Sequence, residues 1–82
     1  MKYITITQSG LSPSGKTKVF RVDSKEAGFE IGYVRFYPKW RKYVYEPLDD
    51  TIYEQVCLRE IASFIEQETI TWRNSKRGAL SA

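Results

Sequence analysis

The segment Gly10–Thr17, with the letters GLSPSGKT, fits the P-loop signature G-x-x-x-x-G-K-T. In a P-loop the glycine-rich backbone cradles phosphates, the lysine contacts the β- and γ-phosphates, and the threonine hydroxyl binds Mg²⁺. This chemistry needs a strand before the loop and a helix after it, because the N-terminus of that helix completes the anion site. Residues 18–24 read KVFRVDS, an alternating β-branched pattern that predicts a second strand instead. We therefore expect a hairpin loop that is inert toward ATP.

The segment Arg35–Tyr45, RFYPKWRKYVY, combines four basic residues with five aromatic ones. Bases stack on aromatic rings while Arg and Lys bind phosphates, so such surfaces suit single-stranded nucleic acid and nucleotides. The alternative is structural: the rings pack the sheet, and the cations are solvated residues that protect a sheet edge. The ligand-binding residues predicted here are Arg35, Tyr37, Trp40, Arg41 and Tyr43.

No catalytic residue, metal site or cofactor is expected. Cys57 lies within an apolar stripe, and the chain contains no histidine to activate its thiol, so the pattern indicates a small core residue. Glu46, Asp49 and Asp50 precede a predicted helix, where turn formation and capping explain them better than a metal site. We expect a binding protein without enzymatic activity.

Four strands are predicted from segments rich in β-branched and aromatic residues. The turn signals between them are a glycine-terminated segment at Ser24–Gly28 and Pro38, which suits the second position of a tight turn. The predicted strands are residues 2–8, 16–23, 29–37 and 40–46.

One helix is predicted from about Ile52 to Thr69, beginning with a capping box formed by Thr51 and Glu54. Asp49 and Asp50 would add negative charge near the positive end of its dipole. On a helical wheel the apolar residues fall within an arc of about 140°. These residues are Tyr53, Cys57, Leu58, Ile61, Phe64 and Ile65.

Together these elements predict an α+β fold: a small antiparallel sheet of three to four strands, followed by one amphipathic C-terminal helix packed on one face. We expect a single domain over residues 1–73 and a flexible basic tail over residues 74–82. In the third strand, Phe29, Ile31, Tyr33 and Tyr37 are expected on one face, with Val34 and Phe36 on the other. Because one helix covers one face, the second apolar face predicts a homo-oligomer.

Charge is unevenly distributed along the 82 residues, whose net charge is +3. Residues 1–45 contain nine basic residues (Lys or Arg) and three acidic ones (Asp or Glu). Residues 46–72 contain one basic and seven acidic residues, and residues 73–82 contain three basic residues and no acidic one. Such asymmetry indicates an anionic partner for the basic segments or a self-complementary assembly. The single cysteine excludes an internal disulfide, and the N-terminal residues resemble neither a signal peptide nor a membrane span, so a cytoplasmic protein is expected.

From Thr17 to Ile65 the chain resembles small uncharacterised proteins encoded by tailed phages and their prophages. The resemblance rests on the segments TKVFRV, GYVRFYPKWRKYVYEP and CLREIASFI. In that family the hairpin commonly reads Trp-Tyr, a Gly-Pro turn and Trp-Arg; here Phe36-Tyr37 and Pro38-Lys39 stand in the first two places. The resemblance implies a phage origin and transfers no functional residues.

The function predicted from these observations is binding by a phage or prophage accessory protein in the host cytoplasm, in regulation or counter-defence. The expected partner is an anionic nucleotide or nucleic acid. The alternative is an acidic patch on a host protein, as an inhibitor would bind. A small enzyme is the third and least supported class.

Overall fold

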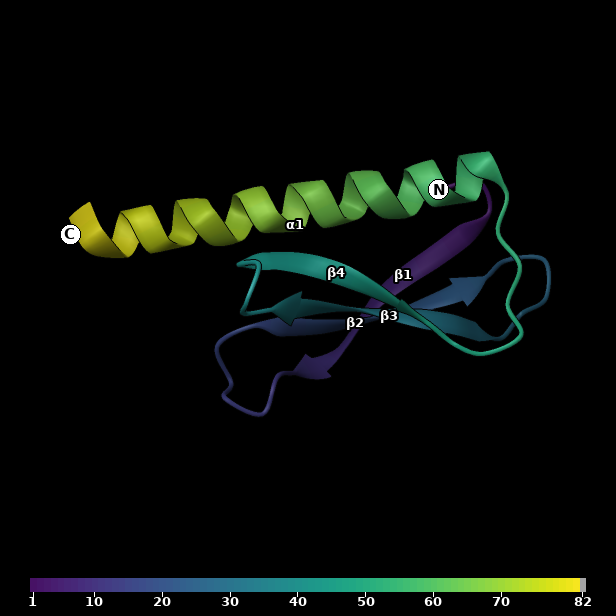
Figure 1. The fold of residues 1–82 in the computed structure, drawn as a ribbon, viewed down its shortest axis with the longest axis horizontal. Helices are drawn as coiled ribbons and strands as arrows, with labels where there is room; N and C mark the ends of the chain where they lie inside the picture. The colour runs from purple at the N-terminus through teal and green to yellow at the C-terminus, as the bar shows by residue number, and fades with distance from the viewer. Residues whose placement is uncertain (82) are drawn as a thin grey trace.

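The computed structural model describes the backbone of residues 1–81 and the side chains of residues 1–76. Four strands form one antiparallel sheet in the order β1-β2-β3-β4, and α1 lies along one face of it (Figure 1). The α+β fold predicted from the sequence is confirmed. The elements are β1 (Ile4–Leu11), β2 (Lys18–Ser24), β3 (Glu30–Tyr37), β4 (Lys42–Pro47) and α1 (Gln55–Ser81).

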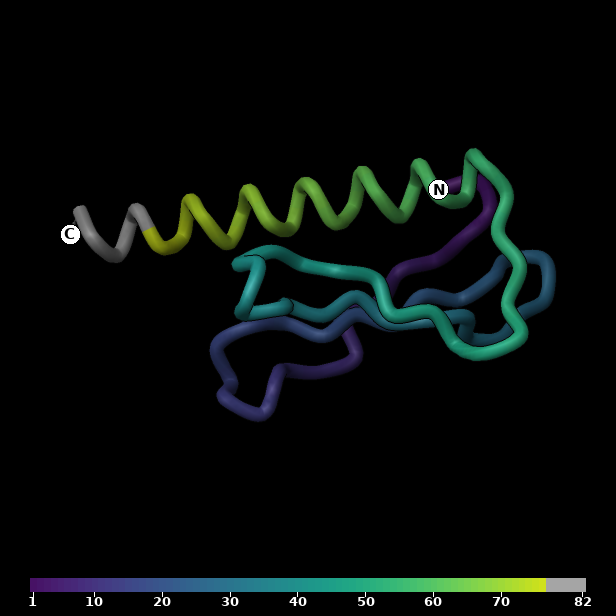
Figure 2. The backbone as a smooth tube through the Cα atoms, viewed as in Figure 1, coloured from purple at the N-terminus to yellow at the C-terminus, as the bar shows by residue number. Residues whose placement is uncertain are grey.

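The path of the chain is a simple meander followed by a long return along the sheet (Figure 2). The molecule measures 45 × 24 × 20 Å, and the chain begins beside the first turns of α1. There the backbone N–H groups of Lys2 and Tyr3 donate hydrogen bonds to the carboxylate of Glu60. These bonds attach the N-terminal end of β1 to the helix.

Two turns are built around the glycine and the proline that predicted them. Gly28 has a φ of 75° and its N–H donates to the carbonyl of Ser24, which closes the β2–β3 turn. In the β3–β4 turn Pro38 takes the second position, and the carbonyl of Tyr37 accepts the N–H of Arg41 at 3.0 Å. Arg41 has a φ of 55°, a left-handed conformation that returns the chain into β4. These turns connect consecutive antiparallel strands.

A β-bulge in β3 changes the expected distribution of its side chains. The pairing with β2 skips Ile31 between Glu30 and Gly32. Because a bulge reverses the alternation beyond it, Ile31 and Val34 both join the core although they are three residues apart. The prediction that Ile31 shares a face with Tyr33 is therefore wrong.

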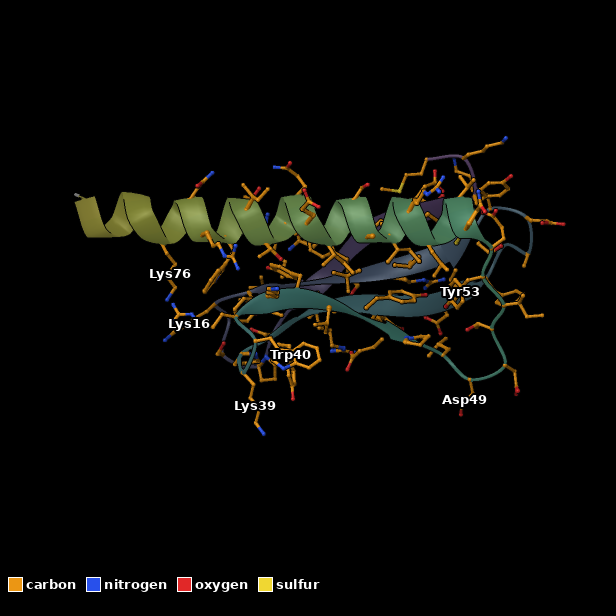
Figure 3. All side chains as sticks on the ribbon, turned by 45° about the horizontal axis from the view of Figure 1, so that its top comes forward. Lys16, Lys39, Trp40, Asp49, Tyr53 and Lys76 are labelled. Carbon is orange, nitrogen blue, oxygen red and sulfur yellow. The ribbon has the colours of Figure 1, made fainter. Side chains whose placement is uncertain are left out.

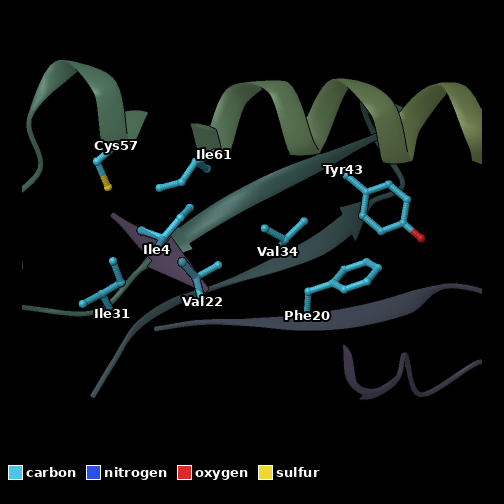
Figure 4. Packing of buried hydrophobic residues seen from close by; sticks show 8 residues of the cluster. All are labelled: Ile4, Phe20, Val22, Ile31, Val34, Tyr43, Cys57 and Ile61. Atoms are coloured by element: carbon cyan, nitrogen blue, oxygen red, sulfur yellow. The ribbon is translucent and has the colours of Figure 1, made fainter. Parts of the chain in front are cut away.

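The core fills the space between the sheet and α1 (Figure 4). Cys57 and Ile61 supply its helical side, and burial raises the pKa of the Cys57 thiol, as expected for a small core residue. Edge-to-face packing extends the core toward the C-terminal half of α1, with the Phe20 and Phe64 ring centres 4.9 Å apart. The buried cluster consists of Ile4, Phe20, Val22, Ile31, Val34, Tyr43, Cys57 and Ile61.

The opposite face of the sheet carries ion pairs. Arg21 pairs with Asp23 at 2.7 Å, and Arg35 pairs with Glu46. The Arg35 guanidinium also lies over the ring of Tyr33, 5.1 Å from its centre. The second apolar face that motivated the predicted homo-oligomer is therefore not present, and oligomerisation stays a prediction.

Helix α1 begins later than predicted, with Glu54 as its N-cap. One carboxylate oxygen of Glu54 accepts the N–H of Cys57 at 2.6 Å, and its backbone carbonyl accepts the N–H of Leu58. The hydroxyl of Thr51 instead donates to the carbonyl of Leu48 at 2.8 Å. The predicted capping box is therefore wrong, and the two acidic residues before Thr51 lie outside the first helical turn.

The helix also extends beyond the predicted end at Thr69, reaching Ser81. Residues 74–81 of the predicted tail therefore lie within α1, while residue 82 lies outside the described residues. In the described part of the chain, α1 lacks an apolar stretch long enough to cross a membrane. The added helical turns place Trp72 against Phe36 of β3 and carry Lys76 past the end of the sheet (Figure 3).

Candidate functional site

The five predicted site residues occupy four different environments. Arg35 lies on the ion-paired face of the sheet. Tyr37 and Trp40 lie at the β3–β4 turn, where their rings pack edge to face with centres 4.8 Å apart. Trp40 remains 66% exposed.

Tyr43 is the one member of the predicted set that lies in the core. It is 5% exposed, and its hydroxyl accepts the backbone N–H of Lys18 at 3.2 Å. Burial raises the pKa of this tyrosine. Its ring packs between Phe20 and Phe36, so its part in the fold is structural.

Arg41 turns away from Tyr37 and Trp40 and lies against the helix. Its guanidinium carbon is 5.7 Å from the ring centre of Trp72. The Nζ of Lys76 lies 5.4 Å from the same ring, and the ring of Phe36 packs on it with centres 4.5 Å apart. Trp72 is thus an aromatic centre with two cations beside it.

Beside Trp72 lies an open groove of about 800 Å³, which we call the basic groove. It is bounded by the β1–β2 loop, the β3–β4 turn and the C-terminal half of α1. Figure 3 shows Lys16 and Lys76 reaching toward one another at this end of the molecule. The lining residues are Ser12, Pro13, Ser14, Lys16, Thr17, Phe36, Pro38, Trp72, Ser75 and Lys76.

The composition of this lining favours an anion that carries an apolar or planar part. Lys16 and Lys76 supply positive charge, and no carboxylate is among the described side chains that line the groove. Three serines and one threonine add hydroxyl donors, while Phe36 and Trp72 supply ring surface. A volume of this order is within the range of small-molecule sites, roughly 300–1,000 Å³.

The loop that resembles a P-loop contributes a side chain rather than a phosphate cradle. The N–H of Ser12 donates to Thr17 and that of Gly15 donates to Ser12, both at 2.8 Å. The N–H groups of Lys16 and Thr17 donate to the hydroxyls of Ser14 and Ser12. Since the loop already satisfies these donors and continues into β2, it does not build the anion site of a P-loop. The predicted hairpin loop is confirmed.

Sequence reasoning missed three residues of the groove. Lys16 was assigned only as the lysine of the P-loop signature, Trp72 lies beyond the predicted helix end at Thr69, and Lys76 falls in the predicted flexible tail. One local signal was present: Trp72 and Lys76 are four residues apart, so they share a face of any helix that reaches them. Among the described residues no group of three or more His, Cys, Asp or Glu side chains is placed to hold a metal ion.

No family model matches the chain, and no solved structure matches it. The chain is similar to an uncharacterised 9.3 kDa protein of Acholeplasma phage L2, with 27% identity over 55 residues. The alignment covers 67% of this chain and 70% of the phage protein. The chain is thus similar to a small protein encoded by a phage.

Proposed function

We propose that this protein binds single-stranded nucleic acid or a nucleotide in the basic groove, without catalysing a reaction. The observation that carries the proposal is the arrangement of Lys16, Lys76 and Trp72 around one groove with no carboxylate among its described lining residues. Lysine side chains bind phosphate oxygens, and an indole ring offers a stacking surface that accepts every base. The serine and threonine hydroxyls add sequence-independent hydrogen bonds.

The proposal shifts the site from the one predicted from sequence. Arg41 stays at its margin, because the guanidinium lies over Trp72. Arg35 and Tyr43 are excluded, since one is paired with Glu46 and the other is buried. Tyr37 and Trp40 lie outside the groove lining.

We further propose that the protein is a phage or prophage accessory protein that acts in the host cytoplasm, in regulation or counter-defence. The similarity to a phage-encoded protein supports this role. The exposed cations of the β3–β4 turn, Lys39 and Lys42, also suit an acidic surface on a host protein, which is the alternative partner. Capture of a host protein that survives nuclease treatment would favour this alternative.

Fluorescence anisotropy with a labelled single-stranded oligonucleotide tests the proposed function. Lys16→Ala and Lys76→Ala should each weaken binding, and each should reduce the salt slope by about one unit. Lys2→Ala is the matched control, because it removes the same charge near Glu60, away from the groove. Binding that is equally strong in all three variants would place the ligand elsewhere, and absence of binding by the parent protein would reject the proposal.

A further inference from the structure

A second cleft lies beside the start of α1 and has the opposite character to the basic groove. Its volume is about 300 Å³. It combines an apolar lining with carboxylates, and no lysine or arginine is among the described side chains that line it. Its lining includes the apolar residues Phe29, Ile31 and Ile52 and the acidic residues Glu26, Asp50 and Glu54. We call this site the acidic cleft.

Two apolar side chains that line the acidic cleft are unusually exposed. Ile52 is 95% exposed and Phe29 is 57% exposed. The segment that presents Ile52 is fixed on both sides. The hydroxyl of Thr51 donates to the carbonyl of Leu48, and the hydroxyl of Tyr53 donates to the carbonyl of Ile31 at 2.8 Å. The exposure of Ile52 is therefore built into the fold, which is typical of a contact site.

At the end of the sheet away from the acidic cleft, one aromatic side chain is exposed to solvent. Trp40 projects from the β3–β4 turn and contacts only the edge of Tyr37 among the described aromatic rings. It does not line the basic groove, and the proposed function leaves it unused. Lys39 precedes it in the chain and is exposed. We call residues 37–42 the tryptophan turn.

We propose that two copies of the chain associate antiparallel, each placing Trp40 in the acidic cleft of the other. Lys39, which is exposed next to Trp40, complements Glu26 and Asp50 at the cleft. Figure 3 shows Lys39 and Trp40 below one end of the sheet and Asp49 and Tyr53 toward the other end of the sheet. Because the turn and the cleft lie at different ends of the sheet, a twofold pair that places one Trp40 in a cleft repeats the same contact by symmetry. Such a pair is closed and twofold symmetric, the commonest form of oligomer.

The contact is expected to be weak and salt-sensitive. An aromatic side chain buries about 150–250 Å² at most, so two tryptophans remain well below the area of a standard interface. The charged residues around them are exposed and screened by salt. The pairing uses Trp40 and the acidic cleft and does not use Lys16, Trp72 or Lys76 of the basic groove.

Sedimentation velocity over a concentration series tests the pairing. The wild-type mass should rise from 9.6 kDa toward twice that value, and high salt should reverse the rise. Trp40→Ala and Ile52→Lys should each remain monomeric, and both sites are exposed enough for the variants to fold, as circular dichroism will verify. Leu58→Lys is the matched control: Leu58 is another exposed apolar residue, outside the cleft, and its variant should pair like wild type.

A mixture of Trp40→Ala and Ile52→Lys gives the decisive result. The first variant keeps its cleft and the second keeps its tryptophan, so the mixed pair retains one of the two contacts and should form where neither variant pairs alone. Its dissociation should be easier than that of the wild-type pair. A wild-type protein that stays at 9.6 kDa throughout, or a mixture that stays monomeric while wild type pairs, would overturn the proposal.

Discussion

At the scale of single residues, a pair of tyrosine hydroxyls connects β4 to the segment that precedes α1. The hydroxyls of Tyr45 and Tyr53 lie 2.5 Å apart, and Tyr53 donates onward to the carbonyl of Ile31 at 2.8 Å. Burial, followed by the hydrogen bond with Tyr53, strongly raises the pKa of Tyr45. This arrangement depends on Gly32, since a Cβ there would lie 2.2 Å from the Tyr45 hydroxyl and 2.7 Å from the Glu46 carbonyl.

Gly32→Ala should therefore lower the free energy of unfolding by about 1–3 kcal/mol, because the added methyl displaces a ring and meets backbone. Urea unfolding measures the change. Gly10→Ala is the control, since its Cβ would meet nothing within 4 Å and its φ is not in the left-handed region. Equal stability of the two variants would show that Tyr45 moves aside at no cost.

At the scale of elements, α1 contributes more than an apolar face, because it also covers an edge of the sheet. Strand β4 is an edge strand, and the N–H of Tyr43 donates to the hydroxyl of Thr69 at 3.1 Å. Thr69 is 6% exposed and is buried together with this bond. The helix thereby satisfies a backbone donor that an uncovered edge would leave to solvent.

Thr69→Val keeps the shape of the side chain and removes the acceptor, so it should destabilise the fold by about 1–3 kcal/mol through an unsatisfied N–H. Thr71→Val is the matched control, because the hydroxyl of Thr71 makes only an exposed 3.5 Å contact with Gln67. Thermal or urea unfolding compares the two. A Thr69→Val protein as stable as the control would mean that water replaces the lost acceptor.

The elements themselves were predictable, because each depends on local signals. Gly28 and Pro38 marked turns, and alternating residues marked strands. The prediction of which β3 side chains share a face of the sheet was wrong, because the bulge at Ile31 breaks the two-residue alternation without a signal in the sequence. The prediction of the cap was wrong because the Thr51 hydroxyl makes a local hydrogen bond to the carbonyl of Leu48, while the Glu54 carboxylate accepts the N–H of Cys57.

At the scale of the whole molecule, charge is separated along the long axis. The basic groove and the tryptophan turn lie toward one end of the sheet, and the acidic cleft lies at the other end of the sheet (Figure 3). Sequence charge counts indicated the asymmetry but not the sites, because Lys16 and Trp72 meet only after the chain has passed through the whole sheet. The predicted site instead followed a contiguous segment, whose members lie in four different environments.

The most direct test of ligand binding in the basic groove uses the fluorescence of Trp40 and Trp72 as two separate reporters. Trp40→Phe leaves Trp72 as the one tryptophan and Trp72→Phe leaves Trp40, each excited at wavelengths that the six tyrosines do not absorb. Titration with a single-stranded oligonucleotide should quench Trp72 by stacking and leave Trp40 unchanged, with Lys16→Ala shifting the midpoint to higher concentration. Quenching of Trp40 while Trp72 stays unchanged would contradict the basic groove as the binding site.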